Sequence, residues 1–501
     1  MTVMTVYEAI ELTLDFAVKK TLIENEDVRF ARNKLLEILM LDSPETADIS
    51  GYGEFETLTP MLNAMTDYAV SANLCADTLE SRDLFSARLA GAVTPSPFEV
   101  RARFKKKYQL APDKAARWFY DMCRACDYIK VDRINKNLRY FASGLEITIN
   151  LSKPEKDPRD IAAALTQKSV GYPRCMLCIE NPGYAGRKGF PARQNHRVIP
   201  LTLGGESWHM QFSPYLYYNE HCIVFSDEHR PMKICEGGFN RLFDFVDQFP
   251  TYFLGSNADL PIVGGSILTH DHFQGGSYSF PMDAAKDEIE LESNSPSITA
   301  AIIDWPMSCL RLKSSNRAAL IACALNVLNA WRKYSDEKLG ILAYTDKPHN
   351  TVTPILRKKG SIYRLDLVLR NNRTDDQNPL GIFHPHADKH HIKKENIGLI
   401  EVMGLMILPG RLLTELKEVE KVLTGALAPE KLSNPGHAPW AWELSDKYGI
   451  CDEAAAHRTV LDAVGDKCRG VLCDAGVYKQ TREGRDGFVK FLNTVGFTNK
   501  I

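Results

Sequence analysis

Excess charge, long apolar runs and cysteine are all scarce in this chain of 501 residues. Lys and Arg number 61 against 63 Asp and Glu, and a formal net charge of −2 supplies no overall field for DNA, RNA or an anionic membrane. The longest apolar runs, 318–327 and 397–409, are shorter than the roughly 18 clean residues of a membrane span or are interrupted by polar residues. Acidic residues interrupt the first 20 positions, which excludes a secretory signal. Twelve cysteines are too few for a disulfide scaffold. We therefore expect a soluble, cytoplasmic protein with reduced cysteines that binds neither nucleic acid nor membrane.

Aromatic residues are plentiful, with 22 Phe, 19 Tyr and 6 Trp, which indicates a folded chain. The length allows about two to four domains. Apolar residues at helical spacing predict helices, and short β-branched stretches between glycines and prolines predict strands. The helices are expected at 7–18, 28–40, 98–125, 318–334, 392–408, 411–423 and from 452 onward, and the strands at 222–226, 260–268 and 364–370.

These patterns predict an α+β fold in four regions. Residues 1–150 form a mainly helical N-terminal region, 151–300 and 301–430 form two α/β halves, and 431–501 form a helical tail. His270-Asp-His272 and His384-Pro-His386 lie about 114 residues apart, each after a β-rich stretch. Such spacing hints at an internal duplication, although two such tripeptides can also arise by chance.

The segment from Gly264 to Gly276 carries the pattern His270-x-His272-x-Gln274. On a strand these three side chains share one face, and the two imidazoles lie about 6–7 Å apart. Glycines on both sides allow a bulky ligand to approach the backbone, and their amides can face phosphate oxygens. The alternative is a buried strand with hydrogen-bonded histidines.

Two Cys-x-x-Cys pairs differ in their surroundings. Cys175 and Cys178 have the spacing of a zinc knuckle, which needs two further ligands; the alternative is a pair of reduced core cysteines. Cys123 and Cys126 lie in a helical run without nearby histidines and are expected in the core. The basic run 101–108 is expected to be a solvated helix face rather than a nucleic-acid site, given the neutral chain.

The order of these motifs resembles a known superfamily. The segment from Ser213 to His229, followed by His-x-His-x-Gln, resembles the histidine-triad nucleotidyl hydrolases and transferases, and the Gln resembles their transferase branch. With the cysteine pair and the runs 189–197, 257–266 and 390–401, most of the chain resembles the second, long bacterial class of galactose-1-phosphate uridylyltransferases. The resemblance implies an α+β fold of two histidine-triad-like halves.

The resemblance also implies a double-displacement reaction. His272 would attack the α-phosphorus of UDP-glucose, because a neutral imidazole is a good nucleophile near pH 7, and galactose 1-phosphate would then take UMP from the uridylyl-histidine. Gln274 would donate N–H groups to the phosphoryl oxygens; unlike a histidine it cannot help to activate water, which favours transfer over hydrolysis. We expect a backbone carbonyl to orient the second nitrogen of His272.

Two metal sites follow from the resemblance. A structural zinc would be held by Cys175, Cys178, His229 and His270, and it would orient His272 two residues on. A second metal such as iron would be held by His349, His384, His386 and Glu288, with Glu290 and Glu292 as alternatives to the last. Phosphate binding is a rival role for that region, which also holds Arg357 and Arg370.

Substrate contacts are carried over residue by residue. Asn257 would meet the nucleotide phosphates, Arg193, Asn195 and Arg197 offer donors for a diphosphate, and Tyr215 could pack on uracil. Glu401 would bind hexose hydroxyls, although this chain reads Glu395-Asn-Ile-Gly-Leu-Ile-Glu401 where the short class has Lys-Phe-Met-Val-Gly-Tyr-Glu. Each of these polar residues could equally stabilise the fold.

Three other functions stay open. The chain could be a UTP-using hexose-1-phosphate uridylyltransferase, a dinucleoside polyphosphate phosphorylase of the same superfamily, or a zinc-stabilised scaffold with an inactive nucleotide site. The scaffold predicts an eroded motif, whereas His270, His272 and Gln274 are all present. The expected partners are sugar phosphates, UDP-sugars and, by resemblance to the family, a second copy of the chain.

Overall fold

The computed structural model describes residues 4–151, 171–265 and 267–500. The chain divides into two compact units. Unit 1 comprises Met1–Lys136 and Ser152–His229, and unit 2 comprises Asn137–Leu151 and Arg230–Ile501. This division groups the residues differently from the four expected regions, which stay a prediction. Within the described ranges no helix is long and apolar enough to cross a bilayer.

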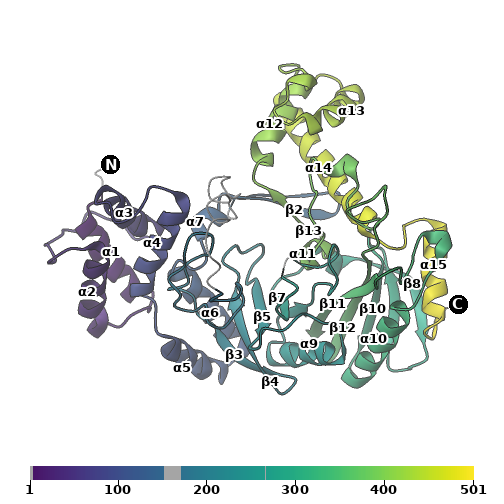
Figure 1. The fold of residues 1–501 in the computed structure, drawn as a ribbon, viewed down its shortest axis with the longest axis horizontal. Coiled ribbons are helices and arrows are strands. Elements are labelled where there is room, and N and C mark those ends of the chain that lie inside the picture. Colours follow the sequence, from purple (N-terminus) through teal and green to yellow (C-terminus); the bar gives the residue numbers. More distant parts are fainter. Residues whose placement is uncertain (1–3, 152–170, 266, 501) are drawn as a thin grey trace. The chain divides into compact units, whose positions relative to one another are not determined.

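Helices dominate the N-terminal part of unit 1, as predicted (Figure 1). Thr5 and Ser96 each close a capping box with the glutamate three residues on, so the first amides of α1 and α5 have acceptors. The helices are α1 (Val6–Lys19), α2 (Val28–Leu39), α3 (Thr59–Ser71), α4 (Leu79–Ala92), α5 (Pro97–Tyr108), α6 (Pro112–Ala125) and α7 (Val131–Ile134).

Three antiparallel strands complete unit 1: β3 (Ile199–Leu203), β4 (Glu206–Phe212) and β5 (Cys222–Ser226), the last as predicted. The β3–β4 hairpin turns at Gly204 and Gly205, whose φ angles of 60° and 76° favour glycine. The ring of Phe212 lies 5.3 Å from Phe119 and 5.1 Å from Tyr120, so β4 packs against α6.

A mixed layer of strands and helices forms the core of unit 2. The strands follow the order β14-β8-β9-β10-β12-β11-β6-β7, and α9 (Glu236–Gln248) and α10 (Arg317–Trp331) pack on the sheet (Figure 1). The strands are β6 (Phe253–Gly255), β7 (His272–Gly276), β8 (Asp287–Ser293), β9 (Thr299–Ile303), β10 (Cys309–Ser314), β11 (Asn350–Lys359), β12 (Ile362–Asn371) and β14 (Phe497–Asn499). The strand expected at 364–370 and the helix expected at 318–334 are confirmed.

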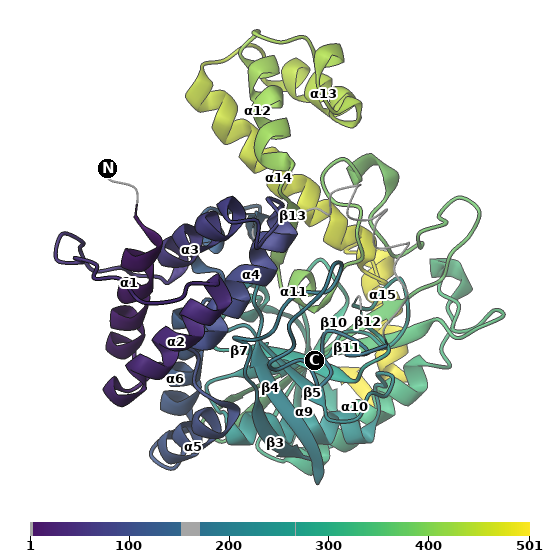
Figure 2. The same ribbon diagram turned by 60° about the vertical axis from the view of Figure 1, so that its left-hand side comes forward.

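A smaller sheet and the C-terminal helices complete unit 2. β1 (Leu138–Ala142) and β2 (Leu145–Asn150) form a hairpin, and β13 (Leu405–Pro409) joins β2 in parallel. The long helix α14 carries the small helical group formed with α12 and α13 at one end (Figure 2). These helices are α12 (Leu412–Leu423), α13 (Ala438–Tyr448), α14 (Glu453–Ala475) and α15 (Arg482–Asn493), which confirms the helical tail and the fold class α+β.

The helix expected at 392–408 is wrong. Only α11 (Leu399–Val402) is helical within that range, and Leu405–Pro409 is strand β13. Gly404 separates them with a φ of 99°, and a Cβ there would lie 2.8 Å from the indole of Trp305. The apolar run after this turn is buried by pairing with β2, a tertiary contact that helical spacing alone does not reveal.

The strand expected at 260–268 is also wrong: the described residues there form a loop, and Ser266 lies outside them. Ile262 has a φ of 72°, which interrupts an extended chain. The loop folds back so tightly that a Cβ on Gly264 would lie 2.5 Å from the carbonyl oxygen of Ala258.

A buried ion pair joins β10 and β12. Arg311 and Asp366 face each other across the strands, 3% and 2% exposed, with two hydrogen bonds of 2.8 and 3.0 Å. We expect Asp366→Asn to lower the free energy of unfolding by about 3–5 kcal/mol, because it leaves a buried guanidinium unpaired. Asp287→Asn is the matched control, since it breaks the exposed pair with Lys313 in the same sheet and should cost at most about 1 kcal/mol. Equal losses in urea titrations of the two variants would contradict the prediction.

Candidate active site

The histidine motif meets the sheet of unit 2 at strand β7. β7 begins at His272, and it pairs with β6 so that Gln274 lies opposite Gly255. His270 precedes the strand in a bend, so the expected shared strand face holds for His272 and Gln274 but not for His270.

His272 is 5% exposed, and its orientation is fixed by the backbone. Its Nδ1 lies 2.8 Å from the carbonyl oxygen of His270. A carbonyl can only accept, so Nδ1 carries the proton and Nε2 keeps its lone pair. The expected backbone acceptor is confirmed and is the carbonyl two residues back. Burial lowers the pKa of His272 to about 4, which keeps the ring neutral at pH 7.

Gln274 is half-buried. Its Oε1 is buried without a hydrogen-bond partner among the described residues. A buried amide oxygen without a donor is uncommon and costs free energy, so the position favours a ligand over a closed protein network.

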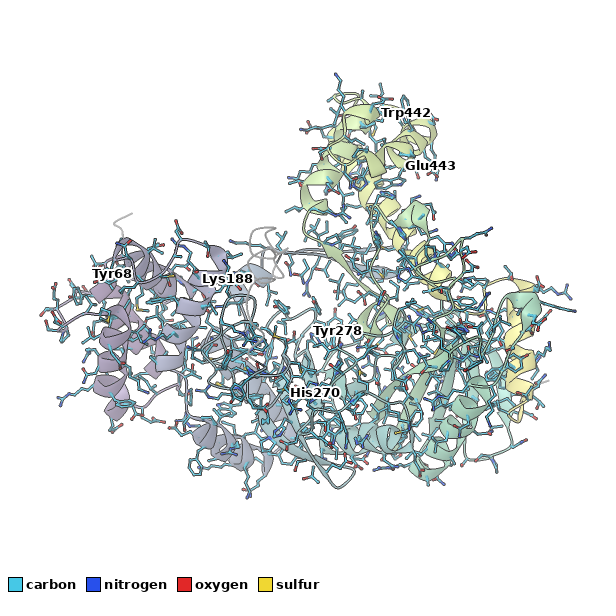
Figure 3. The ribbon with its side chains drawn as sticks, viewed as in Figure 1. Tyr68, Lys188, His270, Tyr278, Trp442 and Glu443 are labelled. Carbon is cyan, nitrogen blue, oxygen red and sulfur yellow. The ribbon has the colours of Figure 1, made fainter. Side chains whose placement is uncertain are left out.

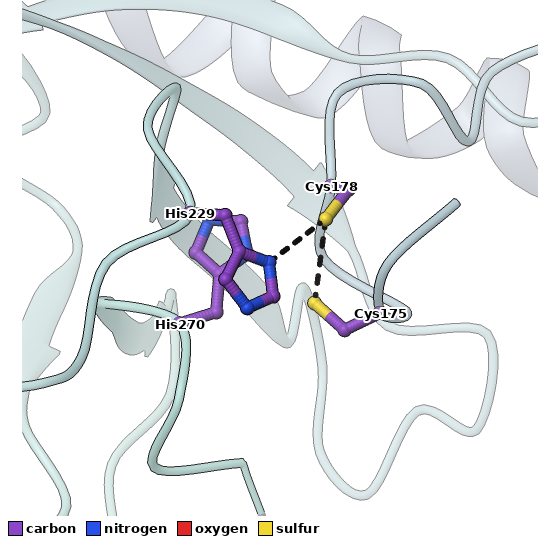
Figure 4. A group of neighbouring side chains, drawn as sticks. All are labelled: Cys175, Cys178, His229 and His270. Carbon is purple, nitrogen blue, oxygen red and sulfur yellow. Dashed lines mark hydrogen bonds between the residues drawn. The ribbon is translucent and has the colours of Figure 1, made fainter. Parts of the chain in front are cut away.

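Cys175, Cys178 and His229 form a compact group in unit 1. The two sulfurs lie 3.6 Å apart, and Cys178 Sγ lies 3.1 Å from His229 Nδ1. The ligand atoms of these three residues and of His270 all lie within 4.8 Å of one another, and this is the single such group among the described residues (Figure 4). The predicted ligand set is therefore brought together, and it is compatible with a metal ion.

Asn181 holds the cysteine turn, and the sequence motif gave no sign of it. It is fully buried, and its Nδ2 donates to the carbonyl oxygens of Cys175 and Cys178 at 2.9 and 2.7 Å. Burial raises the pKa of Cys178 to about 11. A bound cation would lower that pKa, since metals bind the thiolate.

The second expected metal set is not brought together. His349 is bonded through both ring nitrogens, to Thr345 Oγ1 at 2.7 Å and Asn372 Oδ1 at 2.8 Å. His384 lies near Asn396, His386 lies near Asp474, and Glu288 is paired with Arg485 at 2.6 Å. Glu290, one alternative, is bonded to Lys500. These side chains have local partners and form no ligand group among the described residues.

Phosphate binding was the rival role for this region, and its two arginines differ in whether a carboxylate already pairs with them. Arg357 is paired with Asp283 at 2.7 Å. Arg370 is 1% exposed; its guanidinium donates to Ile397 O and Thr353 Oγ1, and its Nε has no partner among the described atoms. Burial lowers the pKa of Arg370 to about 10, so it remains charged at neutral pH. Among the described residues no carboxylate forms an ion pair with Arg370, although Glu401 is near enough to raise its pKa, so Arg370 is the better candidate for an anion.

The three predicted diphosphate donors of unit 1 differ in how far they are already bonded. Asn195 donates to the carbonyl of Cys126 at 2.9 Å. Arg197 donates only to backbone carbonyls, those of Thr94, Pro95, Gln194 and His196. Arg193 is buried, its guanidinium lies 5.6 Å from the ring centre of Tyr128, and its Nε has no partner in the described structure. Asn195 and Arg197 therefore join the loop to the N-terminal helices, and only Arg193 retains an unused donor.

Asn257 and Glu401 are buried in unit 2. Asn257 Oδ1 accepts from the amide of Leu399 at 2.8 Å, which joins the loop after β6 to α11. Glu401 Oε1 accepts from Lys393 Nζ at 3.2 Å, and Oε2 accepts from the amide of Gly398 at 3.1 Å. Lys393 is 5% exposed and was missed, because nothing in the local pattern separates it from a surface lysine. Tyr215 is half-buried in unit 1.

The α+β fold, the buried neutral histidine and the cysteine–histidine group are compatible with a nucleotidyltransferase. Two family descriptions match the chain: "Galactose-1-phosphate uridyl transferase, N-terminal domain" over residues 23–231, and the C-terminal domain over 245–435. The chain belongs to the galactose-1-phosphate uridylyltransferase family.

Curated relatives agree over almost the whole length. The galactose-1-phosphate uridylyltransferase of Caldanaerobacter subterraneus subsp. tengcongensis is 49% identical, covering 97% of this chain and 98% of its own. The one from Fusobacterium nucleatum is 47% identical, over 98% and 99%, and the one from Bacillus subtilis is 46% identical, over 98% of both chains. Among solved structures, yeast Ap4A phosphorylase Apa2 aligns with a TM-score of 0.29 and 12% identity, covering 58% of this chain and 88% of that one.

Proposed function

We propose that the chain transfers UMP from UDP-glucose to galactose 1-phosphate, giving UDP-galactose and glucose 1-phosphate, in galactose metabolism. The observation that carries the proposal is the hydrogen bond from His272 Nδ1 to the His270 carbonyl, which leaves Nε2 as a neutral nucleophile. The names of the relatives, which align over nearly all of this chain, support the same substrates.

In the first step Nε2 of His272 forms a bond to the α-phosphorus, the bond to the bridging oxygen breaks, and glucose 1-phosphate leaves. In the second step a phosphate oxygen of galactose 1-phosphate attacks the same phosphorus, and the P–N bond breaks, which restores His272. Proton transfer to the leaving group is unnecessary, because a sugar phosphate leaves as an anion. Gln274 would donate its side-chain N–H to the phosphoryl oxygens in both steps.

Zinc is the proposed metal of the four-residue group. A tetrahedral site with Zn–S bonds of about 2.3 Å separates two sulfurs by about 3.8 Å, and the observed separation is 3.6 Å. Four protein ligands leave no open position, so the ion would be structural. Its effect on the reaction would pass through His270, whose carbonyl holds His272.

Substrate contacts are proposed for residues that the structure describes in both units. Arg193 is the proposed donor to the diphosphate, since its Nε is unused, and Tyr215 is proposed to pack on uracil. Asn257 is proposed to bind the nucleotide phosphates, and Glu401 is proposed to bind the hexose hydroxyls. Each would use the hydrogen bonds that it does not already make within the protein. We further propose a cytoplasmic homodimer: reduced thiols suit that compartment, and none of the twelve cysteines, all of which lie in the described ranges, forms a disulfide, while pairing of subunits rests on the family resemblance.

Mass spectrometry of the intact chain tests the proposal directly. Mixing with UDP-glucose alone should add one uridylyl group, and digestion should locate it on His272. The adduct should disappear when galactose 1-phosphate is added. No adduct on the wild-type chain, or an adduct that persists in His272→Gly, would overturn the mechanism. Parallel incubations with UTP and diadenosine tetraphosphate separate the two rival activities, and no adduct with any donor would indicate an inactive scaffold.

Gln274→Glu should lower the transfer rate by about 10²- to 10³-fold, because a carboxylate repels the phosphoryl oxygens instead of donating to them. Gln274→His should also impair transfer. Rates are measured in both directions of the reaction. Gln377→Glu introduces the same charge on an exposed loop and should leave them unchanged. Unchanged rates in both Gln274 variants would remove this residue from the mechanism.

A further inference from the structure

A cavity of about 560 Å³ lies within unit 2, lined by residues of helices α13 and α14, of the segments 387–391 and 434–436, and by Arg411 just before α12. None of its lining residues belongs to the site proposed for UMP transfer. Figure 3 shows Glu443, which lines it, on the α13 part of this helical group. The volume lies within the roughly 300–1,000 Å³ of small-molecule sites.

A chain of three side chains ends at the cavity wall. Glu415 Oε2 lies 2.8 Å from His437 Nε2, and His437 Nδ1 lies 2.7 Å from His391 Nδ1. His391 lines the cavity, whereas His437 and Glu415 lie behind it. The imidazole of His391 also packs on the indole of Trp440, another lining residue, with ring centres 5.2 Å apart.

These contacts determine the tautomers. Burial, despite the adjacent Glu415, lowers the pKa of His437, so this ring is neutral at pH 7. The Glu415 carboxylate can only accept, so His437 carries its proton on Nε2 and accepts at Nδ1. His391 must therefore donate from Nδ1, which leaves a lone pair on its Nε2. That Nε2 atom is buried and has no partner among the described residues. It needs a hydrogen-bond donor, and none of the described residues provides one.

The charges around the cavity indicate which kind of ligand could donate this hydrogen bond. The lining holds two carboxylates, Asp388 and Glu443, and two cations, Arg411 and Lys467, and Asp388 is also bonded to Lys389 at 2.9 Å. Arg411 is already bonded to Glu415 and to the carbonyl of His391, and Lys467 lies 4.0 Å from Glu443. No net positive charge is left over for a phosphate. The lining instead offers both hydrogen-bond acceptors and donors: carboxylates, imidazoles, an amide and an ammonium. These groups match hydroxyl groups, which both donate and accept, and the neighbouring indole matches an apolar face of the same molecule.

We propose that this cavity is a second binding site, separate from UMP transfer, which takes an uncharged polyol such as a monosaccharide. One hydroxyl donates to His391 Nε2, the carboxylates of Asp388 and Glu443 accept from others, and the C–H face packs on Trp440. The Glu415–His437 pair acts as a positioning element that holds His391 in the accepting tautomer.

Ligand-observed saturation-transfer NMR tests the proposal on the full chain with D-glucose, D-galactose and myo-inositol as probes. We expect binding in the wild-type chain and in His272→Gly, so the result does not depend on UMP transfer. His391→Phe and Glu443→Gln should each weaken binding at least tenfold and leave the transfer rate unchanged. Glu443 is largely exposed, so its variant keeps the fold even if the histidine variant does not. Trp442→Leu is the matched control, because Trp442 lies on α13 and does not line the cavity.

Two results would overturn the proposal. The first is polyol binding that is absent from the wild-type chain or equal in wild type, His391→Phe and Glu443→Gln. The second is binding of inorganic phosphate or Zn²⁺, measured by calorimetry, that is lost in His391→Phe while the polyols do not bind. That outcome would assign the cavity to an anion or a metal.

Discussion

His272→Asn should abolish the exchange of labelled glucose 1-phosphate into UDP-glucose, with a loss of at least about 10⁴-fold, as expected for removal of a nucleophile. The measurement omits galactose 1-phosphate. Exchange without galactose 1-phosphate requires a covalent uridylyl-enzyme. A direct transfer of UMP from UDP-glucose would need galactose 1-phosphate bound at the same time as the acceptor. The geometry suits the proposed nucleophile, since His272 Nδ1 is bonded to the His270 carbonyl and burial keeps the ring neutral.

His457→Asn provides the control for this experiment. His457 is 52% exposed in its side chain and is bonded to Glu420 on the helical group of unit 2, so its loss should leave the exchange rate unchanged. Calorimetry measures the binding of UDP-glucose to the His272 variant. Binding as in the wild-type chain indicates a lost nucleophile, whereas lost binding indicates a damaged site. Exchange by His272→Asn within tenfold of wild type would exclude the double displacement.

The sequence predicted those parts of the fold whose signal is local. Helix α1 and strand β5 appear where the helix at 7–18 and the strand at 222–226 were expected. The errors occur where a contact with a segment far away in the sequence determines the secondary structure. Leu405–Pro409 has an apolar run that fits a helix or a strand, and only β2 makes it a strand. The loop before β7 has a strand-like composition, but the positive φ of Ile262 depends on how the loop folds back.

The candidate site divides in the same way. The spacings of Cys175 with Cys178, and of His272 with Gln274, are local and could be read from the chain. The carbonyl of His270, the side chain of Asn181 and the buried pair of Lys393 with Glu401 depend on three-dimensional contacts. Arg197 illustrates the reverse: an arginine beside a motif suggests a phosphate, but every hydrogen bond that its guanidinium donates within the described structure reaches a backbone carbonyl. Residue type predicts a capacity to bond, and only the fold determines whether that capacity is already used.

Removing the two cysteines of the cysteine–histidine group should lower the zinc content, the unfolding temperature and the transfer rate of the chain. Cys175→Ala/Cys178→Ala is expected to hold less than about one tenth of the zinc of the wild-type chain, because two histidines alone cannot complete a tetrahedral site. Zinc binding supplies about 10–16 kcal/mol in small zinc domains, so we expect a clear drop in the unfolding temperature. The transfer rate should fall by about 10- to 100-fold, as for other losses of support around a metal site, because His270 then no longer holds its carbonyl against His272 Nδ1.

The chain contains its own matched control in the second Cys-x-x-Cys pair. Cys123 and Cys126 are fully buried in and just after α6, where Cys126 Sγ lies 3.4 Å from the carbonyl of Asn195, and no metal-binding group includes them among the described residues. Cys123→Ala/Cys126→Ala should therefore lose some stability by leaving a small cavity, but keep one zinc per chain by elemental analysis. Equal zinc contents in the two double variants would show that Cys175 and Cys178 do not bind the ion. A zinc-free wild-type chain with full activity would show that the group works without a metal, and that packing and hydrogen bonds alone hold His270 in place.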